Sequence, residues 1–524
     1  MVSWLVGGYL LLGAVFAVLS ALRWLRVAQR EHYIQGWVSR IATLWLMRRP
    51  VNIILLVAAL VFVVLGSVVG TASGWDRLYA LLTMPIAIIL AGLLPIGLRL
   101  RGSSAALNWT ARAKRLIVAY GVVFVGVVLL LLWPFGAAGI AVALVLAPLL
   151  MDFTLVPVNS LEKRLSNKYL VSARKRLDQV RPTVVAITGS YGKTSTKGYL
   201  AHVLDGTFAV VASPASFNNL MGLSRAVNDR VVPGTEVFIA EMGVYGPGDI
   251  RELSKSFPPD IAAITTIGEA HLARMGSREV IAAAKAEITE RARIVVLPID
   301  QPELAALADR CRAEGKTVVT VSTTPGTRAD VVLDAAAGML TVIEPGIPVT
   351  MPVIVPGVGH AVNIAVTVGI AFALGVSAAK IAGKLGNLPG SQHRAEIQHT
   401  AAGVVVIDDT YNSNPVGAER ALHGAAELAA ERGGQLVVVT PGMVELGSVQ
   451  RQRNFEFAAS IAAAGGRLLA VGRTNRAALV SGAGGSEHPV LVYDRREGAV
   501  KAALDLAGER GVILYENDLP DHYP

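Results

Sequence analysis

One short segment of this 524-residue chain restricts its possible folds more than any other. Residues 184–187 read Val-Val-Ala-Ile, and residues 188–196 follow as Thr-Gly-Ser-Tyr-Gly-Lys-Thr-Ser-Thr. The apolar, mostly β-branched run predicts a buried strand, and the glycine-flanked turn after it leads into a helix. Backbone N–H groups in such a turn and at the start of the helix are directed toward an anion. The segment therefore predicts a phosphate loop that binds a nucleoside triphosphate.

Six residues of this loop are expected to contact the nucleotide. Lys193 supplies a point charge, and the Thr194 hydroxyl can ligate Mg²⁺. The common form of the loop has glycine where this chain has Ile187, so the general pattern is only partly matched. A glycine turn beside a surface lysine is the weaker interpretation, because the preceding strand is so apolar. The expected nucleotide-binding residues are Gly189, Ser190, Gly192, Lys193, Thr194 and Ser195.

The first 157 residues differ in composition from the rest. Hydrophobic residues make up 53% of the chain and the mean hydropathy is +0.51, with the excess concentrated before residue 158. Crossing a bilayer takes about 20 apolar residues, and for any single segment of that kind a buried core helix is the alternative. The pattern predicts an all-α membrane domain over 1–157, with spans at about 4–22, 51–70, 77–98, 116–134 and 137–156.

The positive charges predict an orientation for these spans. The net charge is +9, and Arg and Lys are frequent at 23–49, 99–115 and 163–176 but absent from 71–76 and 134–136. Cytoplasmic loops carry the positive residues of membrane proteins. We therefore predict a multi-pass protein of the cell (inner) membrane, with its N-terminus outside and everything after residue 157 in the cytoplasm, where ATP is. The charge is interpreted as this topology signal, and no nucleic-acid partner is expected.

The predicted cytoplasmic part consists of a connector and two α/β domains. Residues 158–182 are basic and helix-prone, and they either lie on anionic lipid headgroups or form a solvated linker. From 183 to 390, apolar strands alternate with helical stretches, which predicts a central ATP-binding domain built on a parallel sheet around the phosphate loop. From 391 to 524 the alternation begins again, which predicts a smaller Rossmann-like domain.

Three polar residues follow predicted strands or lie shortly after them. Glu241 ends the strand at 237–240, His271 follows the strand at 261–264, and Lys285 lies on a helix fourteen residues further along. Loops at the carboxyl ends of parallel strands converge on a bound nucleotide, so these residues could complete its site. Taken singly, each also has an ordinary interpretation: a capping Glu, a surface His and a solvated Lys.

Several motifs together resemble the Mur ligase family. The loop Thr-Gly-Ser-x-Gly-Lys-Thr-Ser followed by Glu, His and Lys has the family's order. Residues 216–222, 271–277, 393–394, 408–415 and 443–447 are similar to five further family motifs, and the resemblance covers about 183–520. It is strongest for members that join D-alanyl-D-alanine to a UDP-muramoyl tripeptide. The resemblance implies ATP-dependent amide-bond formation through an acyl phosphate, in cell-envelope (peptidoglycan) synthesis.

The resemblance also implies roles for individual residues. Lys193 would hold the β- and γ-phosphates, Thr194 and Glu241 one Mg²⁺, and His271 a second. Lys285 would be carbamylated and so become a carboxylate that supports the metal site. The predicted catalytic residues are thus Lys193, Lys285 and His271. Further nucleotide contacts are implied for Asn219, Asn363, Arg394 and Asp409, the last near the ribose.

Three departures from the family leave the acceptor open. The membrane spans stand where the family has its UDP-sugar domain, residues 359–363 keep only the last Asn of a His-Asn-x-x-Asn motif, and residues 515–518 are acidic where a cationic loop is expected. The acceptor is either a soluble UDP-muramoyl peptide or a lipid-linked or polymeric molecule, as for a poly-γ-glutamate-type synthase. The amine is an amino acid or dipeptide, and membrane lipid is a further partner. An ATPase-coupled membrane assembly factor is the alternative from another class.

Overall fold

A computed structural model gives the fold in two compact units, each described here by itself. The first unit contains residues 1–165, 472–474 and 519–524, and the second contains 166–471 and 475–518. The residues that the structure describes are 2–69, 76–100, 106–214, 217–344, 346–355, 360–389, 396–400, 403–410, 413–519 and 522–524.

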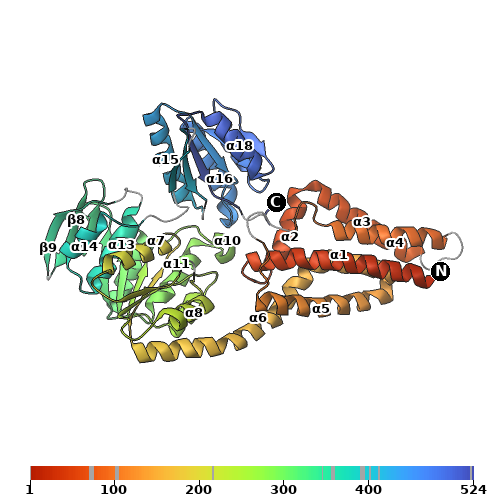
Figure 1. Ribbon diagram of the computed structural model, residues 1–524, viewed down its shortest axis with the longest axis horizontal. Coiled ribbons are helices and arrows are strands. Elements are labelled where there is room, and N and C mark those ends of the chain that lie inside the picture. The colour runs from red at the N-terminus through yellow and green to blue at the C-terminus, as the bar shows by residue number, and fades with distance from the viewer. Residues whose placement is uncertain are drawn as a thin grey trace. The chain divides into compact units, whose positions relative to one another are not determined.

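The first unit is built from helices (Figure 1). Their bounds are α1 (Val2–Arg30), α2 (Trp37–Arg48), α3 (Pro50–Val69), α4 (Asp76–Leu93), α5 (Ala111–Phe135), the 3₁₀ turn η1 (Gly136–Ala138) and the first part of α6 (Gly139–Val180). Each of the five segments predicted to span a membrane therefore overlaps a helix, although α4 ends at Leu93 and leaves residues 94–98 of the predicted span 77–98 outside it. A shared apolar core joins them, with Leu25, Ile41 and Leu116 among its fully buried members.

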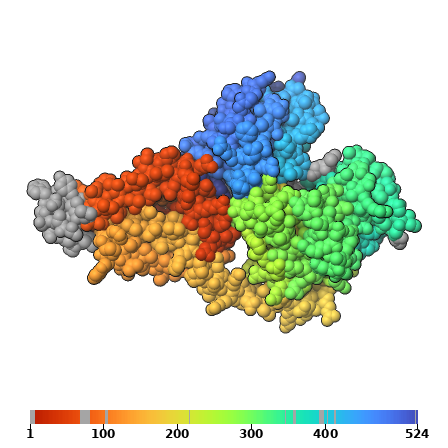
Figure 2. Space-filling view, turned by 180° about the vertical axis from the view of Figure 1, so that it is seen from behind, coloured from red at the N-terminus to blue at the C-terminus, as the bar shows by residue number. Residues whose placement is uncertain are grey.

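Three helical stretches among the described residues are long and apolar enough to cross a membrane. They are Gly7–Arg30, Pro50–Ser67 and Ala111–Val180, the last running through α5, η1 and α6, while Leu82–Leu93 is a shorter apolar helix. Many large apolar side chains of this unit, whose helices are red to orange in Figure 2, are exposed. Trp133 is 95% exposed, and Leu130 and Val122 are more than two-thirds exposed. Such a surface is typical of contact with lipid or with another protein.

Buried polar groups in the helical unit are used to fasten its turns. Asp152 lies inside the predicted span 137–156, and its carboxylate accepts hydrogen bonds from the backbone N–H groups of Gly36, Val38 and Ser39 at 2.8–3.3 Å. It thereby satisfies N–H groups that the first turn of α2 leaves unpaired. Asn52 plays a similar part, since its amide oxygen accepts from Ile96 N at 2.8 Å.

Residues near position 520 also belong to the helical unit. The His522 ring and the Glu31 carboxylate lie 2.8 Å apart, and both side chains are almost fully buried. The Trp45 indole donates to the His522 carbonyl oxygen at 2.9 Å, and the Thr474 hydroxyl donates to the Pro524 carbonyl oxygen at 2.7 Å.

The last turns of α6 are part of the second unit. Ala173 and Leu177 are buried in the core beside the large sheet, together with residues of the helices around it. Arg176 donates to the Val231 carbonyl oxygen at 3.1 Å, and Asn228 donates to the Tyr169 carbonyl oxygen at 2.9 Å. The basic segment predicted as a linker thus supplies a helix that packs on the ligase-like part of the chain.

A nine-stranded sheet forms the centre of this part, in the order β2-β3-β1-β4-β5-β6-β7-β8-β9. Its strands are β1 (Thr183–Thr188), β2 (Val210–Ala212), β3 (Val237–Glu241), β4 (Ile261–Ile264), β5 (Ile294–Pro298), β6 (Thr317–Ser322), β7 (Val331–Asp334), β8 (Met339–Glu344) and β9 (Ile347–Pro352). The helices and 3₁₀ turn among and after them are α7 (Lys193–Leu204), α8 (Leu220–Arg230), α9 (Asp249–Ser256), α10 (Leu272–Met275), α11 (Arg278–Ala286), η2 (Glu287–Thr289), α12 (Pro302–Ala313), α13 (Ala361–Ala373) and α14 (Ala378–Leu385).

The sheet is mixed, which corrects the expectation of a parallel sheet in this domain. Strands β1 to β7 pair in parallel, whereas β7, β8 and β9 pair antiparallel in succession. The reason is the length of the connections, because only residues 335–338 and 345–346 separate these strands. A turn of two to four residues can only reverse the chain, which makes the two strands that it joins antiparallel.

The remaining residues form a smaller α/β domain around a six-stranded sheet, in the order β10-β11-β15-β12-β13-β14. β10 pairs antiparallel with β11, and the other strands are parallel, as the sequence pattern predicted. The elements are β10 (Glu396–His399), β11 (Val405–Asp409), α15 (Pro415–Arg432), β12 (Leu436–Thr440), η4 (Gly447–Val449), α16 (Gln450–Ala463), β13 (Arg467–Val471), α17 (Arg476–Gly482), β14 (Leu491–Tyr493), α18 (Arg496–Ala507) and β15 (Val512–Glu516).

Candidate active site

The predicted phosphate loop joins β1 to α7 at the carboxyl end of the sheet. The strand ends at Thr188, and the helix begins at Lys193. Lys193 folds back over the loop, where its Nζ donates to the Gly189 carbonyl oxygen at 2.7 Å. The backbone N–H of Ser190 donates to the Thr266 carbonyl oxygen at 2.8 Å, so the segment after β4 holds the loop in place. Contacts within the protein therefore hold the loop in this shape.

Two glycines of the loop are required by close contacts as well as by backbone conformation. Gly192 has φ 80°, and a Cβ there would lie 1.9 Å from the Asn363 amide oxygen. A Cβ at Gly189 would lie 1.8 Å from the Thr265 hydroxyl oxygen. Non-glycine residues rarely adopt positive φ, and no side chain tolerates either distance. Asn363, expected at the nucleotide, lies on the first turn of α13 and is thus brought against the loop.

Glu241 ends β3 next to the loop and binds several polar side chains. Its Oε2 accepts from the Thr194 hydroxyl at 3.0 Å and from Lys197 Nζ at 2.9 Å. Its Oε1 accepts from the Asn218 amide at 3.3 Å. Asn219, expected at the nucleotide, caps α8 by accepting from Gly222 N at 2.9 Å. The predicted metal ligands Thr194 and Glu241 are therefore adjacent, and the asparagine beside them is Asn218.

His271 lies after β4 and immediately before α10. Its Nδ1 is 2.8 Å from a carboxylate oxygen of Glu445, whose other oxygen accepts from Arg274 at 2.5 Å. Burial lowers the pKa of His271 and the Lys193 and Lys285 charges lower it further, while the Glu445 carboxylate opposes them. Burial alone would raise the pKa of Glu445, but its bonds to His271 and Arg274 hold it at about 2. Glu445 is therefore a carboxylate and His271 a neutral imidazole. The contact between them uses Nδ1 of the ring and not Nε2.

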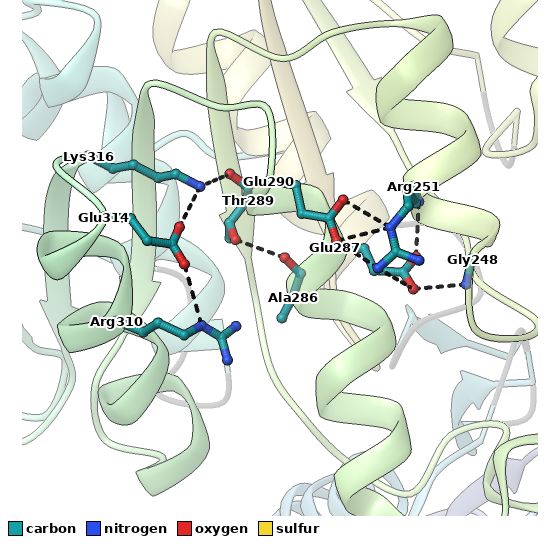
Figure 3. Close-up of polar contacts among 9 residues, drawn as sticks. All are labelled: Gly248, Arg251, Ala286, Glu287, Thr289, Glu290, Arg310, Glu314 and Lys316. Carbon is teal, nitrogen blue, oxygen red and sulfur yellow. Dashed lines mark hydrogen bonds and ion pairs between the residues drawn. The ribbon is translucent and has the colours of Figure 1, made fainter.

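Lys285 lies in the last turn of α11 and is completely buried. Burial lowers the pKa of its amine well below the usual range, and the Lys193 charge lowers it further. The residues that follow fix this end of the helix (Figure 3). The Glu287 carboxylate accepts from Gly248 N and Arg251 N at 2.8 and 3.0 Å. The positive charge of Lys193 is thus close enough to act on the Lys285 amine.

A cavity of about 790 Å³ opens beside the loop. Tyr191, Gly268 and Gln301 line it from the central domain, and Val416 and Phe457 line it from the C-terminal domain. The size and the apolar walls with a few polar groups are typical of small-molecule sites. Burial raises the pKa of Tyr191 to about 12, so its phenol stays neutral.

In the C-terminal domain, two acidic residues lie at the carboxyl ends of neighbouring strands. Asp409 ends β11 and lies beside Glu516, which ends the neighbouring strand β15. The Glu516 carboxylate is fully buried and accepts hydrogen bonds from the hydroxyls of Ser413 and Thr440. Burial raises the pKa of Glu516 to about 7, as does the nearby Asp409, while the two hydroxyls oppose the shift. Arg394, the other nucleotide contact predicted here, lies outside the described residues.

Two family models match this part of the chain. The model described as the Mur ligase middle domain matches residues 187–371, and the one described as the Mur ligase glutamate ligase domain matches residues 393–515. The chain is a member of the Mur ligase family. The resemblance seen in the sequence is thereby confirmed for both domains.

Individual relatives of this Mur ligase chain share one name. UDP-N-acetylmuramoyl-tripeptide–D-alanyl-D-alanine ligase of Mycobacterium leprae is 35% identical over 266 residues, which cover 47% of this chain and 51% of the relative. The enzyme of that name from Bacillus subtilis is 30% identical over 291 residues, covering 55% and 62%. The chain thus spans about half to three-fifths of the length of these two relatives.

Solved structures are similar over the same two domains. The MurF ligase of Thermotoga maritima in complex with ADP has a TM-score of 0.55 and 25% identity, covering 67% of this chain and 80% of that one. MurF from Acinetobacter baumannii has a TM-score of 0.55 at 23% identity, covering 67% and 77%, a likeness of fold.

Several residues of the site in this Mur ligase were not singled out from the sequence. Lys197 is buried against Glu241 with 7% of its side chain exposed, and Asn218 reaches the same carboxylate. Lys197 follows Lys193 by one helical turn, so the spacing could have placed it on the same face. Glu445 stood only within a motif, because its contact with His271 joins residues 174 positions apart.

Proposed function

We propose that this Mur ligase is an ATP-dependent amide-forming ligase of cell-envelope synthesis, held at the membrane by its N-terminal helices. One observation carries the proposal. The phosphate loop follows β1, Glu241 ends β3 and His271 follows β4, and these three strands are neighbours in the parallel part of the sheet. Tyr191 of the loop lines a cavity of a size that suits a small molecule. Relatives named as D-alanyl-D-alanine ligases, and the solved MurF ligase in complex with ADP, support the reaction class.

The residues present fit a divalent cation bound with the nucleotide. The Thr194 hydroxyl and the Glu241 carboxylate are adjacent oxygen ligands of the kind that Mg²⁺ prefers. His271 keeps Nδ1 on Glu445, which suits an imidazole that uses Nε2 for a cation. When bound, Mg²⁺ would neutralise charge on the phosphates.

Lys285 fits carbamylation by its chemistry. A buried ammonium next to Lys193 is unfavourable, and the lowered pKa leaves a neutral amine that can attack CO₂. The carbamate would carry a negative charge in place of the positive one, which turns the repulsion from Lys193 into an attraction. We propose this modified form as the active one.

The proposed reaction uses these residues to hold charge and to exclude water. The γ-phosphoryl group passes from ATP to the acceptor carboxylate, and the amine then displaces phosphate from the acyl phosphate to give the amide. Lys193 would hold the β- and γ-phosphates, with Asn363 beside the loop and Asp409 and Arg394 toward the nucleoside. Both domains line the cavity, so water that would hydrolyse the acyl phosphate can be kept out.

Two acceptor classes remain under this proposal. The names of the relatives favour a UDP-muramoyl tripeptide with D-alanyl-D-alanine. The apolar helical unit favours a lipid-linked or polymeric acceptor, because one spanning helix would already anchor the chain. Of the two acceptors we prefer the UDP-muramoyl tripeptide, to which D-alanyl-D-alanine would be added. This choice rests on sequence similarity within the catalytic domains.

The test is a coupled measurement of ADP release and product mass. Full-length protein in detergent is given ATP, Mg²⁺, D-alanyl-D-alanine and either the UDP-linked tripeptide or its lipid-linked counterpart. A ligase releases ADP only with both acceptor and amine present, and the product gains the mass of the dipeptide minus water. ADP release without either substrate would instead indicate an ATPase-coupled assembly factor and refute the ligase proposal.

A further inference from the structure

A turn of the C-terminal domain contacts the short helix that follows His271. The turn contains residues 445–447, and Ala273 N donates to the Glu445 carbonyl oxygen at 2.9 Å. Gly447, with φ 59°, packs so closely that a Cβ there would lie 3.3 Å from Ala273 Cα. The contact is therefore made through the backbone of both segments and fixes where the Glu445 side chain lies.

His271 and Glu445, whose side chains contact each other here, both have an unusual backbone conformation. His271 has φ 63° and Glu445 has φ 64°, in the left-handed region that favours glycine. Six non-glycine residues with positive φ occur in the described part of the chain, and these two are bonded to each other. Strained residues of this kind are found mainly where surrounding structure holds them for a functional reason.

The Glu445 carboxylate bridges two side chains of the central domain. One oxygen contacts His271 Nδ1 at 2.8 Å, and the other accepts from Arg274 at 2.5 Å. Arg274 is buried, with 5% of its side chain exposed, and stacks over the Tyr245 ring at 5.3 Å. Because the carboxylate can only accept, the His271 proton must lie on Nδ1 and the lone pair on Nε2.

We propose that Glu445 is a positioning residue that sets the tautomer and direction of His271, so that the affinity of the site for a divalent cation depends on this residue of the C-terminal domain. This inference rests on the proposed function only in taking His271 as a cation ligand. A carboxylate behind a histidine ligand fixes its ring and raises its basicity, and its loss costs about 10–100-fold in metal affinity. Since coupling is reciprocal, a bound cation also strengthens the attachment of the turn to α10.

The test measures cation binding without turnover. Full-length protein in detergent at pH 8, with ADP and no acceptor, is titrated with Mn²⁺, and free Mn²⁺ is followed by electron paramagnetic resonance. Glu445→Ala should weaken Mn²⁺ binding about 10–100-fold. Glu445→Gln, which keeps an oxygen for the His271 N–H, should lose less. ADP binding in EDTA should stay within about twofold of wild type in both variants, which also shows that they are folded.

Arg274→Met is the matched control. It removes the ion pair between Arg274 and Glu445, which Glu445→Ala also removes, but it does so by replacing the arginine. It leaves the bond between Glu445 and His271 in place, and the methionine fills the space beside Tyr245. Its Mn²⁺ affinity should stay within about threefold of wild type. If Arg274→Met and Glu445→Ala weaken binding equally, the contact only attaches the two domains and the positioning role is refuted.

His271→Ala separates this inference from the proposed function. If it weakens Mn²⁺ binding while Glu445→Ala does not, His271 is a ligand that needs no orienting carboxylate; the inference fails and the proposed function stands. If His271→Ala binds Mn²⁺ as wild type does, the ligand assignment itself is wrong, and both the inference and that part of the proposed function fail.

Discussion

At the scale of single residues, the site is defined by charges that the fold has removed from water. Lys193 and Lys285 act on one another electrostatically, and Lys285 is completely buried. Two ammonium groups in such a place destabilise each other, and a protein can relieve this by neutralising one of them. The lowered pKa of Lys285 and its proposed carbamylation have the same cause, which is the free-energy cost of a second buried positive charge.

The first prediction concerns Lys285. Lys285→Ala should lower ligation on the order of 100-fold, because it removes the carbamate beside the cation ligands. Acetate or formate should restore part of the rate, since a small anion can occupy the vacated space, and ATP-dependent product formation measures both effects. Lys316→Ala is the control, because that lysine binds the Thr289 carbonyl oxygen away from the loop. An absence of rescue, with an unmodified amine in crystals grown with bicarbonate, would argue against the carbamate.

The second prediction concerns Lys193. Lys193→Ala should lower the rate of ligation by at least about 1000-fold, because the charge that stabilises the transferring phosphoryl group is lost. The protein should remain folded, since the Nζ group donates to the Gly189 carbonyl oxygen of the same loop and the strand and helix on either side do not depend on that bond. ADP release and circular dichroism are the measurements. Turnover close to that of wild type would remove the nucleotide interpretation of the loop.

The third prediction follows from the pKa of Glu516, which burial raises to about 7 from 4.5. Between these pH values the folded protein holds the proton more tightly than the unfolded chain, so stability is greatest below pH 4.5 and falls as the pH rises toward 7. Glu516→Gln does not ionise, keeps an oxygen for one of the two hydroxyls and presents an NH₂ group to the other, which can accept from it. It should raise the free energy of unfolding by about 3 kcal/mol at pH 8 and have little effect at pH 4.5. A pH-independent difference in thermal unfolding would contradict this.

At the scale of elements, what could be predicted from the sequence depended on how local the signal was. Some elements are encoded by patterns within one uninterrupted stretch of sequence, and the structure contains them. They are the phosphate loop, the parallel strands and the helices of the first unit. The antiparallel strands β7 to β9 were not separated from the parallel ones, because short connections rather than strand composition decide their direction.

The candidate site was predictable where motifs carried it and unpredictable where distant segments meet. Lys193, Thr194 and Glu241 came from motifs and lie together. Glu445 was visible as part of a motif, but its carboxylate bonds across 174 positions, a contact that no local pattern encodes. Asn218 and Asn219 are indistinguishable in a run of two asparagines, and only the start of α8 decides which one becomes the cap.

The fourth prediction concerns the turn into α7. Gly192→Ala should lower the free energy of unfolding by about 1–3 kcal/mol, because it puts a side chain at φ 80° against Asn363. Binding of ADP, measured by calorimetry, should weaken as well. Gly198→Ala is the matched control on the same helix, with nothing within 4 Å of the added carbon. It should stabilise the protein by up to about 1 kcal/mol, and equal effects of the two changes would contradict the steric argument.

At the scale of the whole molecule, α6 is shared by both units. It runs from Gly139 to Val180, and Ala173 and Leu177 near its end lie in the core beside the large sheet. The ligase-like part of the chain therefore needs these turns of α6 for its own stability. Any division of the protein into its helical unit and its Mur ligase domains has to be made within this helix.

The fifth prediction uses that division. A fragment that starts at residue 158 should fold and bind ADP, whereas one that starts at 183 should be less stable by more than about 2 kcal/mol, because it uncovers the core at Leu177. Leu177→Ala in the longer fragment should fall between them in thermal unfolding. If the fragment from 158 also ligates a soluble UDP-linked acceptor as fast as the full-length protein ligates its best substrate, the helical unit is only a tether. Equal stability of the two fragments would contradict the role assigned to α6.

The bond between Glu31 and His522 has a consequence for the order of folding. The two residues are 491 positions apart, yet they belong to one compact unit. At about 5–20 residues per second, a ribosome needs roughly 25 to 100 s to make the chain between them. The hydrogen bond from the Trp45 indole to the His522 carbonyl oxygen can form only after a similar time. The helical unit, synthesised first, is therefore completed last, after both sheets have had time to form.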